Sequence, residues 1–111
     1  MTVRLLAFTD KGLALAQRLA GLLGGEAVRC GGAVTLVGWT ADAFASADAL
    51  VFVGAVGIAV RAIAPHLQSK ATDPAVVAVD EAGRFAIPLA SGHLSARVSF
   101  RFSVDNVIHL P

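Results

Sequence analysis

The residues from Gly54 to Arg61 bring two glycines and a cation together at the end of an apolar segment. That segment, 49–53, is predicted to be a buried strand, and a helix is predicted over 58–64. Glycines in such a turn let a ligand approach the backbone, and the free N–H groups of a helix N-terminus attract anions. Arg61 lies one helical turn beyond Gly57 and could direct its guanidinium to the same anion. Because the G-x-x-G spacing matches neither the dinucleotide nor the phosphate-binding glycine pattern, a tight and closely packed turn is the alternative.

A second group of charged residues surrounds one predicted turn. Asp80, Glu81 and Arg84 flank or belong to a sequence typical of tight turns, in which Gly83 suits a positive φ. The group could form a polar rim over a binding site, because loops at the edge of a rigid sheet often carry function. The alternative is the solvated tip of a hairpin.

His93 is the third candidate, and it follows Ser91 and Gly92 at a predicted helix start with Ser91 as the cap. The positive end of a helix dipole disfavours the imidazolium, so a neutral ring would be available as a base or as a hydrogen-bond partner. A structural histidine bonded to its own turn is the alternative. Cysteine and histidine residues do not occur at metal-ligand spacing, and no metal site is predicted.

The elements that must position these residues are predicted to alternate between strands and helices. Strand-like segments are 3–8, 26–30, 49–53, 76–79 and 84–89, and helix-like segments are 13–23, 41–47 and 58–64. Thr9 or Asp10 is expected to cap the first helix and Thr40 the second, whereas 34–37 looks extended but short. This alternation predicts an α/β fold, a three-layer sandwich with a mostly parallel sheet and one β-hairpin.

The size and composition of the chain limit its class. Its 111 residues fit one domain, and they are 56% hydrophobic but only 15% charged. A net charge of +1 gives no field of one sign, so nucleic acid is not an expected partner. No uncharged run approaches the ~20 residues of a membrane span, so no membrane partner is expected. A single cysteine favours a reducing compartment, and a cytoplasmic protein is predicted.

Two long segments resemble a known family. The segment 49–65, ALVFVGAVGIAVRAIAP, and the segment 72–94, TDPAVVAVDEAGRFAIPLASGHL, are similar to two signatures of the CbiG proteins, the cobalt-precorrin-5A hydrolases of anaerobic cobalamin (vitamin B12) biosynthesis. The resemblance covers most of residues 1–94 and corresponds to the N-terminal domain of the family. From residue 95 the sequence departs from the family pattern, so 95–111 is interpreted as a divergent tail produced by a frameshift or truncation.

The resemblance implies a hydrolase that opens the ring A δ-lactone of a cobalt-corrinoid intermediate and releases acetaldehyde. It implies no cofactor of the protein's own, because the substrate, a tetrapyrrole-derived macrocycle, carries the cobalt. The peripheral carboxylates of such a substrate would suit Arg61, Arg84 and the backbone amides near Gly54 and Gly57. Asp80, Glu81, Ser91 and Gly92 complete the predicted binding set, and His93 is the hypothesised base.

Other readings remain open from the sequence. This chain could be a non-catalytic corrinoid-binding module that needs a partner chain or the family's further C-terminal domain. Self-association is a related expectation, because an apolar face would stay uncovered where the family's next helix packs. A generic nucleotide-binding domain is the weaker possibility, since no acidic ribose ligand or phosphate-binding lysine stands at the right spacing.

Overall fold

A computed structural model of the chain describes residues 1–90. The elements in this part of the chain are β1 (Val3–Ala7), α1 (Asp10–Leu23), β2 (Glu26–Arg29), α2 (Leu36–Ser46), β3 (Ala49–Val53), α3 (Val56–Ile63), a 3₁₀ turn η1 (Ala64–His66), β4 (Ala75–Val79) and β5 (Ala86–Ala90). The strands form one sheet in the order β2-β1-β3-β4-β5. All neighbours pair in parallel except β4 and β5, which form an antiparallel hairpin.

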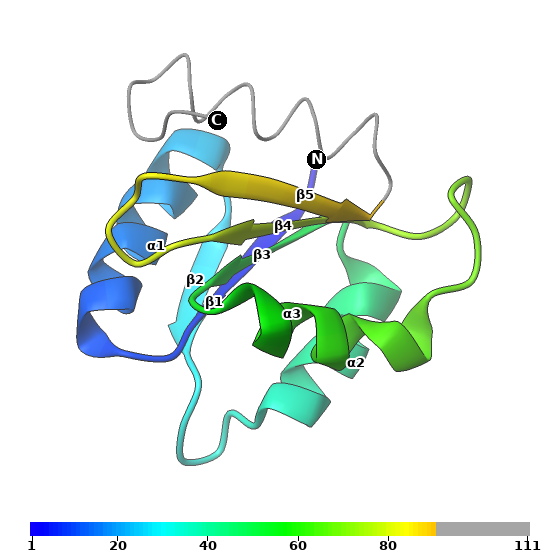
Figure 1. The fold of residues 1–111 in the computed structure, drawn as a ribbon, viewed down its shortest axis with the longest axis horizontal. Coiled ribbons are helices and arrows are strands. Elements are labelled where there is room, and N and C mark those ends of the chain that lie inside the picture. Colours follow the sequence, from blue (N-terminus) through cyan, green and yellow to red (C-terminus); the bar gives the residue numbers. More distant parts are fainter. Residues whose placement is uncertain (91–111) are drawn as a thin grey trace.

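The sheet is the middle of three layers. Helix α1 covers one face, and α2 and α3 cover the other (Figure 1). The predicted α/β sandwich with a mostly parallel sheet and one hairpin is therefore confirmed.

The central strands are apolar on both faces because both faces are covered. Every residue of β3 and β4 is buried, as expected for strands in the middle of a parallel sheet. Leu5 and Val51 face α1, whereas Leu50 and Phe52 face α2 and α3. Trp39 of α2 packs edge-on against Phe52, with ring centroids 5.5 Å apart, and this contact fixes α2 on the sheet.

Local signals explain where α1 begins and ends. The Thr9 hydroxyl accepts a hydrogen bond from the backbone N–H of Gly12, which makes Thr9 the N-cap. Gly24 ends the helix in the left-handed region at φ 72°, a conformation that glycine adopts without strain.

The predicted start of α2 is wrong. Its cap is Thr35, whose hydroxyl accepts the N–H of Gly38, and the helix begins at Leu36 rather than at residue 41. Thr40 lies inside the helix and is fully buried, and its hydroxyl has no partner within the described residues. Helix α3 also begins earlier than predicted, at Val56 rather than at residue 58.

The predicted turn at Asp80–Gly83 joins β4 to β5, with Gly83 at φ 72°. Because β5 runs antiparallel, Ala90 pairs with Val76 at the edge of the sheet where the parallel strands begin. Ser91, Gly92, His93 and the helix predicted after them lie outside the described residues, as does the proposed boundary at residue 94. The chain therefore enters these residues from the edge opposite Gly54.

None of the helices within residues 1–90 is both long and apolar enough to cross a membrane. Several large apolar side chains in this range are exposed, including Val56 and Val60 on α3 and Phe85 and Ile87 near or on β5. Whether such groups support self-association stays a prediction.

Candidate functional site

The strand order creates a crevice at one edge of the sheet. β1 lies between β2 and β3, and the chain leaves β1 for a helix on one face but leaves β3 for a helix on the other. Parallel sheets with this order bind ligands outside the carboxyl ends of the strands, where the direction of the connections changes. Here that point lies between the turn after β1, at Phe8 and Thr9, and the turn after β3, at Gly54 and Ala55.

A hollow of about 590 Å³, the switch-point hollow, occupies this crevice. Its lining comes from the turn after β1, the start of α3 and the β4–β5 turn, and consists of Phe8, Thr9, Lys11, Gly54, Ala55, Ile58, Asp80, Glu81, Ala82 and Arg84. The volume falls in the range of small-molecule sites. The hollow therefore joins apolar side chains with two anions and two cations.

A hydrogen bond connects the two sides of the crevice. The Thr9 hydroxyl donates to Oε1 of Glu81 at 2.5 Å, across 72 positions of sequence. The same hydroxyl oxygen accepts the N–H of Gly12, so Glu81 also sets the orientation of the α1 cap. A Cβ at Gly12 would lie 3.2 Å from Thr9 Oγ1 and 3.5 Å from Glu81 Oε1, so glycine there makes room for both groups. Glu81 places its negative charge near the positive end of the α1 dipole, which is a stabilising position.

Asp80 organises the turn from which Glu81 extends. Its Oδ1 accepts the backbone N–H groups of Arg84 at 2.7 Å and Phe85 at 2.8 Å. Its Oδ2 lies 3.5 Å from Nε of Arg84. Burial by itself would raise the pKa of Asp80, but the N–H groups of Phe85 and Arg84 and the Arg84 guanidinium together hold this pKa below its ordinary value. Asp80 is therefore an ionised anchor of the turn and its lone pairs are largely engaged.

The structure gathers some of the predicted site residues and separates others. Gly54, Asp80, Glu81 and Arg84 all line the hollow. Gly57 and Arg61 do not, although they lie only a few residues beyond Gly54.

The outward direction of Gly57 and Arg61 follows from the helical period. Ala59 and Ile63 of α3 are buried against the sheet, whereas Gly57 and Arg61 are exposed and lie one turn apart on the other side of the helix. No Cβ contact within 4 Å would arise at Gly57. Ser91, Gly92 and His93 are outside the described residues, and their predicted roles stay predictions.

Sequence reasoning missed most of the opposite wall of the hollow. The sequence indicates no site role for Phe8 or Lys11, and it marks Thr9 only as a helix cap. A buried strand followed by a capped helix is the sequence pattern that could have indicated this wall, because it places the turn after β1 at the carboxyl end of a parallel strand. The sequence does not state that this turn faces the β4–β5 turn.

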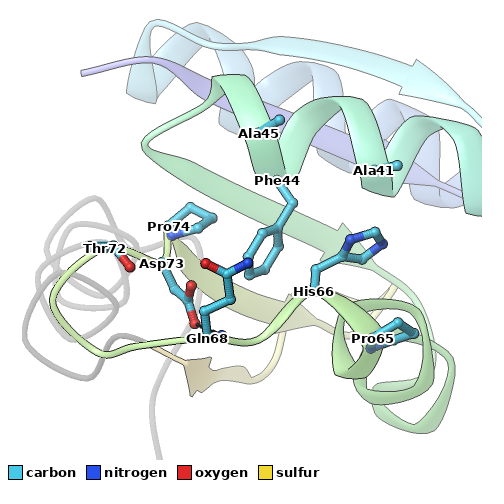
Figure 2. Close-up of a pocket in the computed structure, with 9 residues that line it drawn as sticks. All are labelled: Ala41, Phe44, Ala45, Pro65, His66, Gln68, Thr72, Asp73 and Pro74. Atoms are coloured by element: carbon cyan, nitrogen blue, oxygen red, sulfur yellow. Dashed lines mark hydrogen bonds between the residues drawn. The ribbon is translucent and has the colours of Figure 1, made fainter.

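A second hollow, of about 310 Å³, lies at the opposite edge of the sheet. Figure 2 shows Phe44 extending from α2 toward His66, with Gln68, Thr72 and Asp73 from the loop before β4. The rings of Phe44 and His66 stack at 5.5 Å, and Asp73 accepts the backbone N–H groups of Gln68 and Ser69. These contacts hold the loop together, and none of the predicted site residues lies here. The first hollow is therefore the candidate site.

Residues 1–90 contain no group of three His, Cys, Asp or Glu side chains placed to hold a metal ion. The chemistry available at the candidate site is that of carboxylates, cations, a hydroxyl and backbone amides.

Comparisons with known proteins identify the family. Residues 38–108 match the family model described as Cobalamin synthesis G N-terminal. A cobalt-precorrin-5A hydrolase from Salmonella typhimurium is 43% identical over 101 residues, a match that covers 83% of this chain and 29% of the relative. A cobalt-precorrin-5A hydrolase from Priestia megaterium is 45% identical over 51 residues, which are 46% of this chain and 14% of that relative. The chain thus spans less than a third of the length of these relatives.

A solved structure supports the fold independently. The crystal structure of a cobalamin biosynthesis protein G homologue from Sulfolobus solfataricus superimposes with a TM-score of 0.78 at 23% identity. The superposition covers 96% of this chain and 35% of the other. The match of the family model over more than half of the chain shows that this protein belongs to the Cobalamin synthesis G N-terminal family.

Proposed function

We propose that this chain acts in cobalamin biosynthesis as the N-terminal domain of a cobalt-precorrin-5A hydrolase, and that its switch-point hollow binds the edge of the cobalt-corrinoid substrate. The observation that carries the proposal is the 43% identity to a cobalt-precorrin-5A hydrolase over 101 residues. In this proposal the cobalt belongs to the substrate and the domain supplies no ligand to it. We assign the activity to the cytoplasm, in keeping with a single cysteine.

The lining of the hollow supports a macrocycle edge as its occupant. Phe8, Ala55, Ile58 and Ala82 offer apolar surface to the flat carbon framework of a corrinoid. Charged groups lie on the same rim and can meet the acetate and propionate side chains that project from that framework. Because the hollow is open, the rest of the ring can extend beyond it.

Lactone opening requires a base for water and donors for the oxyanion. Water, losing a proton to the base, bonds through its oxygen to the carbonyl carbon, and the bond from that carbon to the ring oxygen breaks to leave a carboxyl group and an alkoxide. Acetaldehyde is released when this alkoxide becomes the aldehyde carbonyl while the carbon–carbon bond from its carbon to the macrocycle breaks, and the electron pair of that bond and a proton go to the macrocycle. The cap of α3 is Ala55, which has no side-chain hydrogen bond to the first turn, so backbone N–H groups at this rim are available to an anion. Asp80 is engaged with backbone N–H groups and Glu81 with Thr9. We keep His93, hypothesised from the sequence, as the proposed base; in this proposal the chain brings it back to the hollow from Ala90, which lies at the opposite edge of the sheet.

A corrinoid-binding experiment tests whether the switch-point hollow is the substrate site. Ala82→Trp places an indole in the hollow, and Ala33→Trp adds the same group to an exposed loop outside it. We expect titration with a cobalt corrinoid, followed by its visible absorption, to show loss of binding in Ala82→Trp only. Wild-type protein that binds no corrinoid, or equal binding by both variants, would contradict the assignment.

Acetaldehyde release tests the chemical step. We expect the full chain, or the chain joined to the remaining part of a hydrolase relative, to release acetaldehyde from cobalt-precorrin-5A. His93→Gln should abolish release while leaving corrinoid binding intact. Normal release by His93→Gln would remove this residue as the base, and binding without release by any form of the wild-type protein would favour the non-catalytic module.

A further inference from the structure

Lys11 is a cation at the candidate site that has no acidic partner in the described part of the chain. It lies in the first turn of α1 and lines the switch-point hollow. The ion pairs within residues 1–90 join Arg4 to Asp42, Arg29 to Asp10 and Arg84 to Asp80, and none includes Lys11. Its side chain is exposed, so the ammonium can move toward a ligand.

The acidic residue next to Lys11 in sequence and the two acidic residues of the hollow already have other partners. Asp10, its neighbour in sequence, lies 3.4 Å from Nε of Arg29 at the end of β2. Glu81 accepts the Thr9 hydroxyl, and Asp80 accepts two backbone N–H groups. Within residues 1–90, Lys11 is therefore the cation of the hollow that has no ion pair, and Glu81, which accepts only a neutral hydroxyl, is the anion of the hollow that has none.

Helix stability does not explain a lysine at this position. A cation in the first turn faces the positive end of the helix dipole, which is unfavourable. Glu81 already supplies the stabilising negative charge near this end of α1. An anionic ligand in the hollow would instead give Lys11 a partner, and Arg84 stands on the β4–β5 turn of the same hollow as a second cation.

We propose that Lys11 binds a peripheral carboxylate of the corrinoid and makes the hollow prefer carboxylate side chains over amides; this inference rests on the function proposed above. An ammonium gains an ion pair with a carboxylate, whereas a neutral amide offers only its carbonyl oxygen. Lys11, Arg84, Asp80 and Glu81 have formal charges that sum to zero, so this preference arises by contact and not from a long-range field.

The test compares two corrinoids and two lysine variants of the full chain. Dicyanocobyrinic acid carries free peripheral carboxylates, and dicyanocobinamide carries amides in their place. Lys11→Gln removes the charge but keeps a good helix former, and Lys70→Gln removes the same charge from an exposed loop outside the hollow. We expect Lys11→Gln to bind the acid about 1.5- to fivefold more weakly, the effect of an exposed ion pair, and to bind the amide unchanged. Lys70→Gln should match the wild type with both.

Two further measurements separate a ligand contact from a structural role. Raising the salt concentration should weaken acid binding by the wild type more than by Lys11→Gln. The thermal midpoint of Lys11→Gln without ligand should equal or exceed that of the wild type, because the substitution removes a cation from the helix start. A lowered midpoint would indicate a structural lysine and count against the inference.

The outcomes distinguish this inference from the function on which it rests. If the wild type binds both corrinoids and Lys11→Gln changes neither affinity, the inference is wrong and the proposed function stands. If the wild type prefers the acid and Lys70→Gln loses as much affinity as Lys11→Gln, the preference comes from net charge and the inference is also wrong. If the wild type binds neither corrinoid, both proposals fail.

Discussion

The two glycines of the Gly-x-x-G segment should respond to alanine with opposite signs. A Cβ at Gly54 would lie 2.9 Å from Cδ2 and 3.4 Å from Cε2 of Phe8. A Cβ at Gly57 would have no contact within 4 Å, and Gly57 sits in the first turn of α3 with ordinary helical surroundings. The sequence treats these residues alike, and their environments in the fold separate them.

The magnitudes follow from these contacts. Carbon atoms pack at about 3.5–4.0 Å, so Gly54→Ala must displace the Phe8 ring by at least about half an ångström. Overpacking of this kind costs about 1–3 kcal/mol, and the backbone adds strain because Gly54 has a φ of 158°, which L side chains rarely adopt. Gly57→Ala should instead stabilise the protein by about 0.5–1 kcal/mol, since alanine loses less backbone entropy in a helix.

Urea unfolding measures both effects with an intrinsic probe. Trp39 is the single tryptophan and is buried against Phe52, so its fluorescence reports the packing of α2 on the sheet. The unfolding midpoint should fall for Gly54→Ala and rise for Gly57→Ala, with unchanged slopes. In a thermal scan, 1 kcal/mol corresponds to roughly 4–8 °C for a domain of this size.

A destabilised Gly57→Ala, or a Gly54→Ala as stable as the wild type, would refute this reasoning from contacts. The same variants also address function. If Gly57→Ala is more stable yet binds corrinoid more weakly, Gly57 is needed for close approach of the ligand, as predicted from the sequence. Unchanged binding would leave Gly57 outside the site, where the orientation of α3 places it.

Two further predictions concern the turns around the hollow. Thr9→Ala and Glu81→Ala should show a coupling of about 0.5–1.5 kcal/mol in a double-mutant cycle read by urea unfolding, because they share one hydrogen bond; strictly additive effects would mean that the bond contributes nothing. The folded-state pKa of Asp80 is lowered, so its charge stabilises the fold above the ordinary value of 3.8, and this stability is lost as the pH falls through the lowered pKa. Asp80→Asn should therefore be less stable than the wild type near neutral pH, with a difference that shrinks below pH 3.8, and a difference independent of pH would contradict this assignment.

Local patterns in the sequence predicted the strands within residues 1–90, with each end at most two residues from its position in the structure. The segment 49–53 is continuously apolar and the segment 3–8 is apolar except for Arg4, a pattern typical of strands that helices cover on both faces. Buried strands occupy 49–53 and, but for the half-buried Arg4, Val3–Ala7. The cap at Thr9 and the turn ending at Gly83 were also predictable, because each depends on hydrogen bonds or backbone angles within a few residues.

The start of α2 shows where local patterns stop being sufficient. Thr35 and Thr40 are both suitable caps, and nothing within a few residues decides between them. The decision comes from burial, since a helix that begins at Leu36 places Trp39 and Ala43 against the sheet and against Phe52. That gain depends on β3, which follows α2 in the sequence.

The candidate site was only half predictable for the same reason. The sequence by itself marked Gly54 and the charged turn after β4 as reactive positions, since glycines and charges after buried strands lie at a sheet edge. Only the tertiary structure decided that β1 lies beside β3, which brings Thr9 and Lys11 to that turn and directs Arg61 away from it. Strand order is set by the packing of whole faces of the sheet against α1, α2 and α3, and the bond between Thr9 and Glu81 across 72 positions exists only after that packing is complete.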